Sequence, residues 1–356
     1  MRALGASRTS LVPGGVLAGP WVRDPLWRRA RAVPSLDLRF ADNKSLVDAV
    51  TGASLVTFTR ASSGTYVGSD GVLQTAATNA PRFDHDPTTG ESLGLLVEEQ
   101  RTNLLLNSGT LSTQSVTVTA VAHTLSFTGT GTITLTGTST AGPLVGTGTG
   151  ESNRVSLKFT PTAGSLTLTV SGTVTNAQLE IGAFRTSYIP TTTAAVTRSA
   201  DVASIAGSAF SSWYRQDEGT VFADAKNYPH PVTGEALVPL AFSDNTYNNR
   251  IALAGSTGNN QFNFDVVSAG SFQRTILGNF VSSGLKASGG YKSTGSAGSL
   301  NGAATVTSNT PNIPSVIGRL DIGQPHDGNN ALNGCISRLT YWPVRLGNNV
   351  LQQITQ

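Results

Sequence analysis

Residues 115–138, SVTVTAVAHTLSFTGTGTITLTGT, and residues 154–182, RVSLKFTPTAGSLTLTVSGTVTNAQLEIG, decide the fold. Threonine or serine alternates with valine, leucine, isoleucine or phenylalanine at a period of two residues. This alternation is typical of strands with one buried face and one solvated face. Two such runs, broken only by short turn-forming segments, predict an antiparallel β-sandwich.

A second group of strand-like runs begins near residue 200. Runs such as EGTVFADAKNY, NRIALAG and ALNGCISRLTYWPV are separated by Gly, Asn and Pro. Their spacing of about 10–15 residues is that of an antiparallel sandwich or jelly roll. The polar stretch YIPTTTAAVTRSAD, residues 188–201, is the expected hinge. Only LGNNVLQQITQ, residues 346–356, is expected to be helical, with Asn348 as its cap.

The predicted fold class is therefore all-β, with two β-sandwich or jelly-roll domains after an extended N-terminal arm. The expected division is an arm over residues 1–35, a Thr-rich sandwich over residues 36–195 and a jelly roll over residues 196–356. Composition agrees, because 13% charged residues is well below the usual quarter and 38% hydrophobic residues still suffice for a core.

The single cysteine, Cys335, excludes an intrachain disulfide. Its alternating surroundings, LNGCISRLTYW, predict a buried and inert side chain. No apolar run approaches the roughly 20 residues of a membrane span. The early segment LVPGGVLAGPWV is broken by proline and glycine, so it is a poor signal-peptide core. We expect a soluble protein made in a cytoplasm.

The positive charge is concentrated at the start of the chain. Residues 1–39 hold seven arginines against two aspartates, a net +5, whereas the whole chain carries +3, so the remainder sums to −2. Tryptophan and arginine are residue types that anchor interfaces, which predicts an arm that docks into a larger assembly. Its candidate docking residues are Trp21, Arg23, Trp27, Arg28, Arg29 and Arg31. The alternatives are a nucleic-acid-binding tail and a segment packed on its own domain, and the near-neutral body speaks against nucleic acid.

Residues 82–106, RFDHDPTTGESLGLLVEEQRTNLLL, gather polar side chains around a Pro-Thr-Thr-Gly turn. We interpret them as scaffold: an aspartate at the turn entry binds backbone amides, Glu98 or Glu99 pairs with a nearby arginine, and Asn103 satisfies strand-end groups. Two alternatives stay open. Asp84, Asp86 and Glu98 offer oxygen ligands for calcium, although no EF-hand loop is present, and the carboxylates offer an acid/base pair.

Catalytic motifs are missing from the sequence. The acidic residues after position 200 lack the spacing of a jelly-roll glucanase, the four histidines fit no zinc spacing, and no nucleophile elbow or phosphate loop occurs. We therefore expect a protein that is not an enzyme and needs no cofactor, with structural calcium at Asp244 or Asp327 as a weak alternative.

Loop composition suggests glycan binding, because lectin sites combine an aromatic platform with amide and charged groups. The alternative is that Asn-rich loops are simply good turn formers. Three sets of candidates follow from the loops DNTYNNR and QPHDGNN and from an aromatic pair: Tyr247 with Asn245, Asn248, Asn249 and Arg250; His326 with Asp327 and Asn329; and Trp213 with Tyr214.

Two resemblances add to this interpretation. LNGCI followed by RLTYWPVRLGNNVLQQIT, residues 338–355, resembles the closing strand and tail of concanavalin A-like and laminin-G-like jelly rolls. Residues 55–108 and 178–205 resemble a module of tailed-bacteriophage head fibres, head spikes and tail fibres that usually precedes a lectin-like domain. This second match covers most of residues 36–201.

The resemblance implies a structural protein of the virion surface that is docked by its N-terminal arm to capsid, portal-adaptor or tail proteins. It implies a homo-oligomer, most simply a trimer, that binds host surface polysaccharide, without nucleic-acid binding or membrane insertion. Attachment to the head and to the tail both stay open. The rival functions are a capsid decoration or cement protein without glycan binding and, with less support, a polysaccharide depolymerase.

Overall fold

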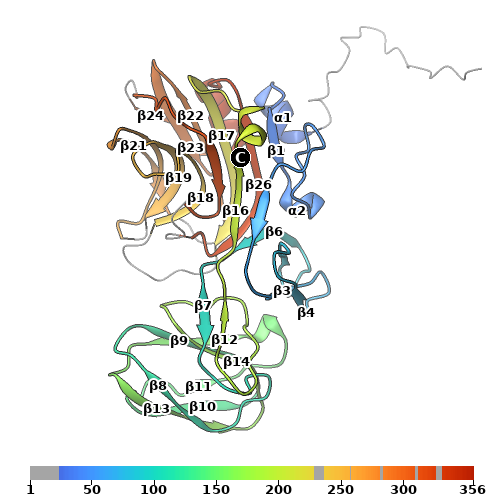
Figure 1. Cartoon of the computed structure of the whole chain (residues 1–356), viewed down its shortest axis with the longest axis vertical. Coiled ribbons are helices and arrows are strands. Elements are labelled where there is room, and N and C mark those ends of the chain that lie inside the picture. The colour runs from blue at the N-terminus through green and yellow to red at the C-terminus, as the bar shows by residue number, and fades with distance from the viewer. Residues whose placement is uncertain (1–23, 228–235, 257, 281–283, 309–311, 326–330) are drawn as a thin grey trace, which may run out of the picture.

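The alternating runs of the sequence form strands, and they assemble into two separate β-sandwiches (Figure 1). The computed structural model describes residues 24–227, 236–256, 258–280, 284–308, 312–325 and 331–356. Within these ranges no helix has the length and apolar character that crossing a membrane requires. The all-β fold class predicted from the sequence is confirmed.

The first sheet of the large sandwich pairs strands that lie far apart in the sequence. The last strand of the chain lies at its centre, between strands from the middle and from the beginning of the sequence. In order, the sheet contains β24 (Val306–Ser308), β23 (Gly295–Leu300), β22 (Leu285–Lys292), β17 (Glu218–Asn227), β26 (Gly334–Trp342), β6 (Ser92–Val97) and β5 (Phe83–His85), and β1 (Leu36–Leu38) also pairs with β26.

The second sheet packs against the first and buries one side of each strand. Alternation is clear in β18 and β19, where Leu240, Phe242, Ile251 and Leu253 enter the core. In order, this sheet contains β2 (Thr57–Thr59), β16 (Val202–Ala206), β25 (Arg319–Ile322), β18 (Ala236–Ser243), β19 (Arg250–Ser256), β20 (Gln261–Ser268) and β21 (Ser271–Asn279). Its other face is turned outward and forms the candidate site described below.

The small sandwich is formed by the Thr-rich runs. One sheet contains β11 (Leu144–Val145), β10 (Thr132–Gly137), β13 (Gly164–Ser171) and β8 (Gln114–Val118), and the other contains β12 (Val155–Phe159), β9 (His123–Gly129) and β14 (Val174–Ile181). Ile133, Leu135, Leu166 and Leu168 are buried while the threonines between them are largely turned outward. The predicted sandwich is confirmed, although β9 buries its Thr124, Ser126 and Thr128 as well as its apolar side chains.

The strand pairing does not follow the expected division at residue 195/196. Strands from residues 36–97 belong to the same sheets as the C-terminal strands, since Leu96 pairs with Cys335 and Phe58 with Ala203. The small sandwich is an insertion that leaves the large one after β7 (Arg101–Asn103) and returns at β15 (Val196–Arg198), and these two strands pair with each other. Periodicity identifies strands but not their partners, which is why the boundary was misplaced.

Residues 24–35 are not an extended arm. Asp24 caps α1 (Pro25–Ala30) by accepting from the backbone N–H groups of Leu26 and Trp27. Leu26, Trp27 and Ala30 pack on the large sandwich beside Trp342, as one of the alternatives for this segment supposed. Arg28, Arg29 and Arg31 are exposed on this docked helix and its C-terminal cap, with Arg29 donating to the carbonyl of Gln356. Trp21 and Arg23 lie outside the described residues.

Short helices and one hairpin complete the fold. The expected C-terminal helix is confirmed as α4 (Asn348–Ile354), but Asn348 is its first residue and not a side-chain cap. Cys335 is buried in β26, as predicted. The other elements are α2 (Phe40–Asn43), α3 (Ser208–Ser211), a 3₁₀ turn (Glu151–Asn153) and the hairpin of β3 (Gly64–Val67) with β4 (Leu73–Ala76).

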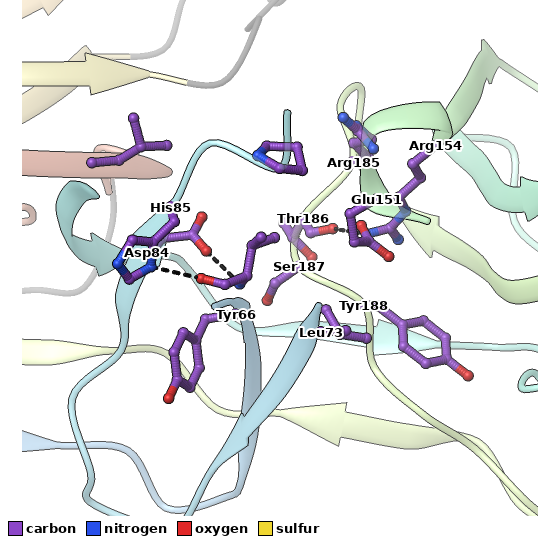
Figure 2. Close-up of a pocket in the computed structure, with 13 residues that line it drawn as sticks. Tyr66, Leu73, Asp84, His85, Glu151, Arg154, Arg185, Thr186, Ser187 and Tyr188 are labelled. Atoms are coloured by element: carbon purple, nitrogen blue, oxygen red, sulfur yellow. Dashed lines mark hydrogen bonds and ion pairs between the residues drawn. The ribbon is translucent and has the colours of Figure 1, made fainter. Parts of the chain in front are cut away.

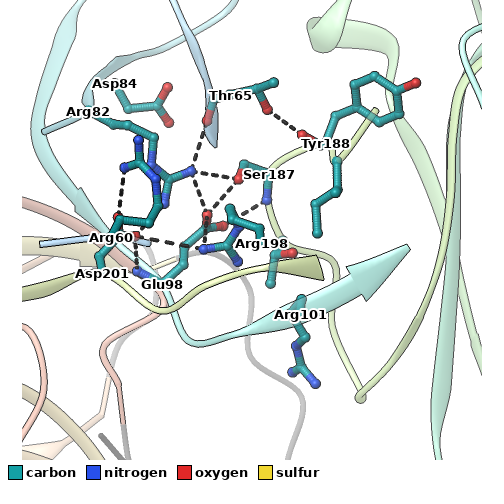
Figure 3. Close-up of polar contacts among 12 residues, drawn as sticks. Arg60, Thr65, Arg82, Asp84, Glu98, Arg101, Ser187, Tyr188, Arg198 and Asp201 are labelled. Atoms are coloured by element: carbon teal, nitrogen blue, oxygen red, sulfur yellow. Dashed lines mark hydrogen bonds and ion pairs between the residues drawn. The ribbon is translucent and has the colours of Figure 1, made fainter. Parts of the chain in front are cut away.

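A buried ionic network lies where the insertion leaves the large sandwich (Figure 3). Arg60 contacts Asp201 at 3.0 Å, and Arg82 contacts both Asp201 and Glu98, the latter at 2.9 Å. Arg198 approaches Glu98 at 3.4 Å. All five side chains are at most 1% exposed. Burial raises the pKa of Glu98, but Arg198 and Arg82 oppose this and hold the pKa at about 2, so the carboxylate is charged.

The polar stretch at residues 82–106 is therefore largely scaffold. Besides Glu98, Asp84 accepts from the backbone N–H of Val67 at 2.6 Å, and Asp86 accepts from two amides of the turn that follows it. Asn103 binds four backbone groups, and Glu99 pairs with Arg101. Among the residues that the structure describes, no group of three side chains is arranged to hold a metal ion.

Candidate functional site

The outward face of the second sheet carries a row of side chains that crosses five strands. The register places Asp321, Ala241, Ala252, Asp265 and Arg274 side by side on β25, β18, β19, β20 and β21. Ala241 and Ala252, with Val238 and Ala254, form a small apolar cluster on this face. Because alanine is short, the middle of the face is lower than its charged ends, and the result is a depression that we call the sheet pocket.

The sheet pocket is shallow, with a cavity volume of about 60 Å³. Loop residues Thr246 and Tyr247 contribute to one wall, and Pro325 to another. Apolar floor and polar walls together are the composition of small-molecule binding sites.

Each carboxylate of the pocket is paired with arginine. Asp265 is fully buried and accepts two hydrogen bonds of 2.8 Å from Nε and Nη2 of Arg274, and Nη2 of Arg250 lies 4.0 Å away. The pKa of Arg274 is raised, first by its hydrogen bond to Asp265. Asp321 accepts from Nε of Arg319 at 2.8 Å and from the hydroxyl of Ser243 at 3.1 Å.

Arg274 keeps donors for a ligand. Its guanidinium has five N–H groups, of which the bidentate contact to Asp265 uses two. The side chain is 40% exposed, so the remaining donors face solvent at the edge of the pocket.

Aromatic rings form the rim. Arg250 lies between Tyr247 and Phe272, with its guanidinium carbon 4.8 Å and 5.0 Å from the two ring centres. Phe272 is on the edge strand β21 and is 53% exposed. A large apolar ring held by cation–π contacts and still half open to solvent is suited to pack against a ligand.

Asn263 carries a buried polar atom on this face. It stands on β20 two residues before Asp265, between Ala254 and Ile276 of the neighbouring strands. It is 1% exposed, and its Oδ1 has no hydrogen-bond partner among the described residues. A buried acceptor without a partner destabilises a fold by about 1–3 kcal/mol, so this position is suited to accept a hydrogen bond from a donor that enters the pocket.

The structure brings two of the predicted site residues, Tyr247 and Arg250, into the sheet pocket. Their neighbours shape the loop instead: Asp244 accepts from Thr246 and Asn249, and Asn245 has the left-handed backbone of a turn with φ 72°. Asn249 also accepts from the N–H of Ala269, and Asn248 is exposed. Both carboxylate oxygens of Asp244 thus accept hydrogen bonds within the turn, which makes them poor ligands for the suggested calcium ion. His326, Asp327 and Asn329 lie outside the described residues.

The predicted aromatic pair of Trp213 and Tyr214 is not a surface platform. Trp213 is 7% exposed and belongs to the core of the large sandwich, where it packs with Phe210, Phe242 and Tyr341. Burial raises the pKa of Tyr214, whose ring stacks on Phe210. A short helix, α3, turns both rings inward, which the sequence did not indicate.

Sequence reasoning missed four residues of the site or its rim: Asn263, Asp265, Phe272 and Arg274. A signal was present, because QFNFDVVS places Asn263 and Asp265 at a period of two between apolar residues. Such alternation predicts a strand with one apolar and one polar face, so it indicated that these two residues share the polar face.

The two carboxylates of the sheet pocket are far apart. Asp265 and Asp321 are three strands apart, which corresponds to about 14 Å at the usual strand spacing. Glycoside hydrolysis uses carboxyl groups about 5–10 Å apart. Both groups are also paired with arginine, so the described part of this pocket does not have the arrangement of a glycosidase centre.

Comparison with known proteins identifies no family. No family model matches the chain, and no curated protein matches it. Among solved structures, it is similar to the NanB sialidase from Streptococcus pneumoniae (11% identity, TM-score 0.32, 43% of this chain and 26% of that one). It is also similar to the CBM40 of the Ruminococcus gnavus IT-sialidase (12%, 0.32, 40% and 84%) and to domain 4 of AbnA, a GH43 arabinanase from Geobacillus stearothermophilus (11%, 0.35, 44% and 73%).

The chain thus spans about a quarter of the NanB sialidase that it matches. At these identities and TM-scores the likenesses carry no argument about activity. The β-sandwich assignment rests on the strand pairing of the chain itself.

Proposed function

We propose that the chain binds glycans in the sheet pocket. The observation that carries this proposal is the buried Oδ1 of Asn263, which lines the pocket and has no hydrogen-bond partner among the described residues. A sugar hydroxyl is a donor that satisfies Asn263. Phe272 lies four residues further along the sheet, beside Val267, so a different ring of the same glycan packs on it. Exposed donors of Arg274 add contacts to sugar oxygens.

The geometry of the pocket favours binding of a glycan over its hydrolysis. Asp265 and Asp321 are held by arginines and are separated by the alanine floor. Such carboxylates orient the arginines of a binding site and are poor proton donors or nucleophiles. Depolymerase activity therefore stays the weaker alternative.

The biological setting is a further part of the proposal and rests on the sequence resemblance of residues 36–201. In this setting the chain is a surface protein of a tailed-phage virion, a homotrimer that contacts other virion proteins and binds polysaccharide of the host envelope. The docked position of α1 limits any docking arm to residues before Asp24. The rival function is a decoration protein without glycan binding, and the following experiment distinguishes the two functions.

Replacing Phe272 by alanine is expected to weaken binding to the glycan about tenfold, the effect of losing one aromatic contact worth about 1.4 kcal/mol. The whole chain would be titrated with surface polysaccharide extracted from the host. Stability should change little because Phe272 is half exposed.

Val145→Ala is the matched control, since Val145 is 55% exposed on the small sandwich, away from the pocket. It should bind as the original chain does. Absence of saturable binding by the original chain would favour the decoration protein, and equal binding by both variants would remove the sheet pocket from the proposal.

A further inference from the structure

A second cavity lies where the small sandwich meets the β3–β4 hairpin and β5 of the large one (Figure 2). The large sandwich contributes Tyr66, Leu73 and His85, and the inserted sandwich contributes Glu151 and Arg154. The cavity volume is about 90 Å³. We call it the junction pocket, and it shares no residue with the sheet pocket.

The side chain of Glu151 is only 9% exposed and lines this cavity. One carboxylate oxygen, Oε2, lies 3.6 Å from Nη1 of Arg154. The other, Oε1, is buried and has no hydrogen-bond partner among the described residues. A carboxylate oxygen that lacks a hydrogen-bond partner is costly to bury.

Arg154 is also incompletely bonded. Its Nη1 donates to the carbonyl of Thr186 at 3.2 Å and its Nη2 to the hydroxyl of Ser126 at 2.9 Å. Its Nε is buried and lacks a partner within the described part of the chain. An open acceptor and an open donor therefore belong to adjacent side chains. A hydroxyl group satisfies both kinds of partner, because it donates one hydrogen bond and accepts others.

The remaining wall is largely apolar. Tyr66 is half-buried, Leu73 faces the cavity from β4, and the ring of Tyr188 is fixed by a 2.7 Å hydrogen bond between its hydroxyl and that of Ser108. Flat rings and aliphatic groups opposite a few polar atoms suit a ligand with an apolar face and hydroxylated edges.

Charge in the cavity is balanced. Glu151 and Asp84 oppose Arg154 and Arg185 among its lining residues, so neither an anionic nor a cationic ligand is favoured. His85 gives no further guide: its Nδ1 donates to the carbonyl of Val67 at 2.9 Å, and Figure 2 shows the other ring nitrogen on the side away from Glu151.

We propose that the junction pocket is a second binding site, which takes one uncharged polyhydroxylated ring of the size of a monosaccharide. One hydroxyl bonds to Oε1 of Glu151, a hydroxyl oxygen accepts from Nε of Arg154, and the ring face lies on Tyr66 and Leu73. This site is independent of the sheet pocket, and binding there links the two sandwiches.

The test uses the whole chain carrying Phe272→Ala, which weakens the sheet pocket, and measures saturation-transfer NMR and titration with D-glucose, D-galactose and D-mannose. Glucuronate and glucosamine serve as charged comparators. At least one neutral sugar should bind, and more tightly than both comparators. Leu73→Trp, which fills the cavity, should abolish that binding, and Glu151→Gln should weaken it about tenfold.

Thermal unfolding of each variant confirms that it is folded, and Tyr66→Ala replaces Leu73→Trp if the tryptophan prevents folding. Binding that survives both the filled cavity and Glu151→Gln overturns the site. No binding of any neutral sugar, or tighter binding of a charged comparator, overturns the proposed ligand class. Each of these results leaves the proposal for the sheet pocket untouched, since that pocket is tested separately, by comparing polysaccharide binding of the original chain with that of Phe272→Ala and Asn263→Leu.

Discussion

Replacing Arg82 by methionine is expected to lower the free energy of unfolding by about 3–5 kcal/mol, the cost of removing one partner from a buried ion pair. Arg82 contacts Glu98, Asp201 and the hydroxyl of Ser187 and is fully buried. Without it, Glu98 and Asp201 share two remaining arginines, Arg60 and Arg198, in a site that excludes water.

Chemical denaturation of the whole chain measures this effect. Arg28→Met is the matched control, because Arg28 is exposed on α1, and its expected change is within about 0.5 kcal/mol. An Arg82→Met protein as stable as the control would contradict the view that the buried ionic network stabilises the fold. A loss confined to one of two unfolding transitions would show which sandwich depends on the network.

Replacing Trp27 by alanine is expected to destabilise the large sandwich by about 3–5 kcal/mol, as for other large-to-small core substitutions. The ring is 8% exposed, packs near Trp342, and donates from Nε1 to Asp37 at 3.0 Å. Asp37 is itself bound by Arg338 and Arg39, so the indole closes a buried polar cluster.

Trp27→Phe separates packing from the hydrogen bond. It keeps most of the buried ring and should cost about 1–2 kcal/mol, mainly from the lost hydrogen bond to Asp37, whose Oδ2 still accepts from Arg39 and Arg338. Equal stability of the original chain and the alanine variant would show that α1 is not docked in solution. The tryptophan would then be available to an external partner, as the sequence alone suggested.

The strands of both sandwiches were predictable because alternation is a local property. Residues 115–138 and 154–182 form strands, and β10 and β13 bury the apolar side that was predicted, whereas β9 is buried on both sides. Cys335 and the C-terminal helix were also placed correctly. The insertion was not predictable. Nothing in the residues of β6 shows that its partner is a strand more than 200 positions later, because pairing is decided by packing across the whole sheet.

The candidate site was predicted in part for the same reason. Tyr247 and Arg250 were found through the composition of a loop, which is visible in the sequence. Asn263 and Asp265 are in one strand and Arg274 is in the next, and only the register brings them beside Ala252 and Ala254. Trp213 was misassigned because an exposed aromatic and a core aromatic look alike until their surroundings are known.

Asn263→Leu gives the most direct measurement of the central claim that the sheet pocket binds glycan. The substitution keeps the size of the side chain and removes a buried acceptor that has no partner among the described residues. Its free energy of unfolding should be equal to that of the original chain or about 1 kcal/mol higher, while its affinity for host polysaccharide falls at least tenfold. A residue that costs stability and supports binding is part of a functional site. Unchanged affinity in a stable Asn263→Leu protein would contradict the account.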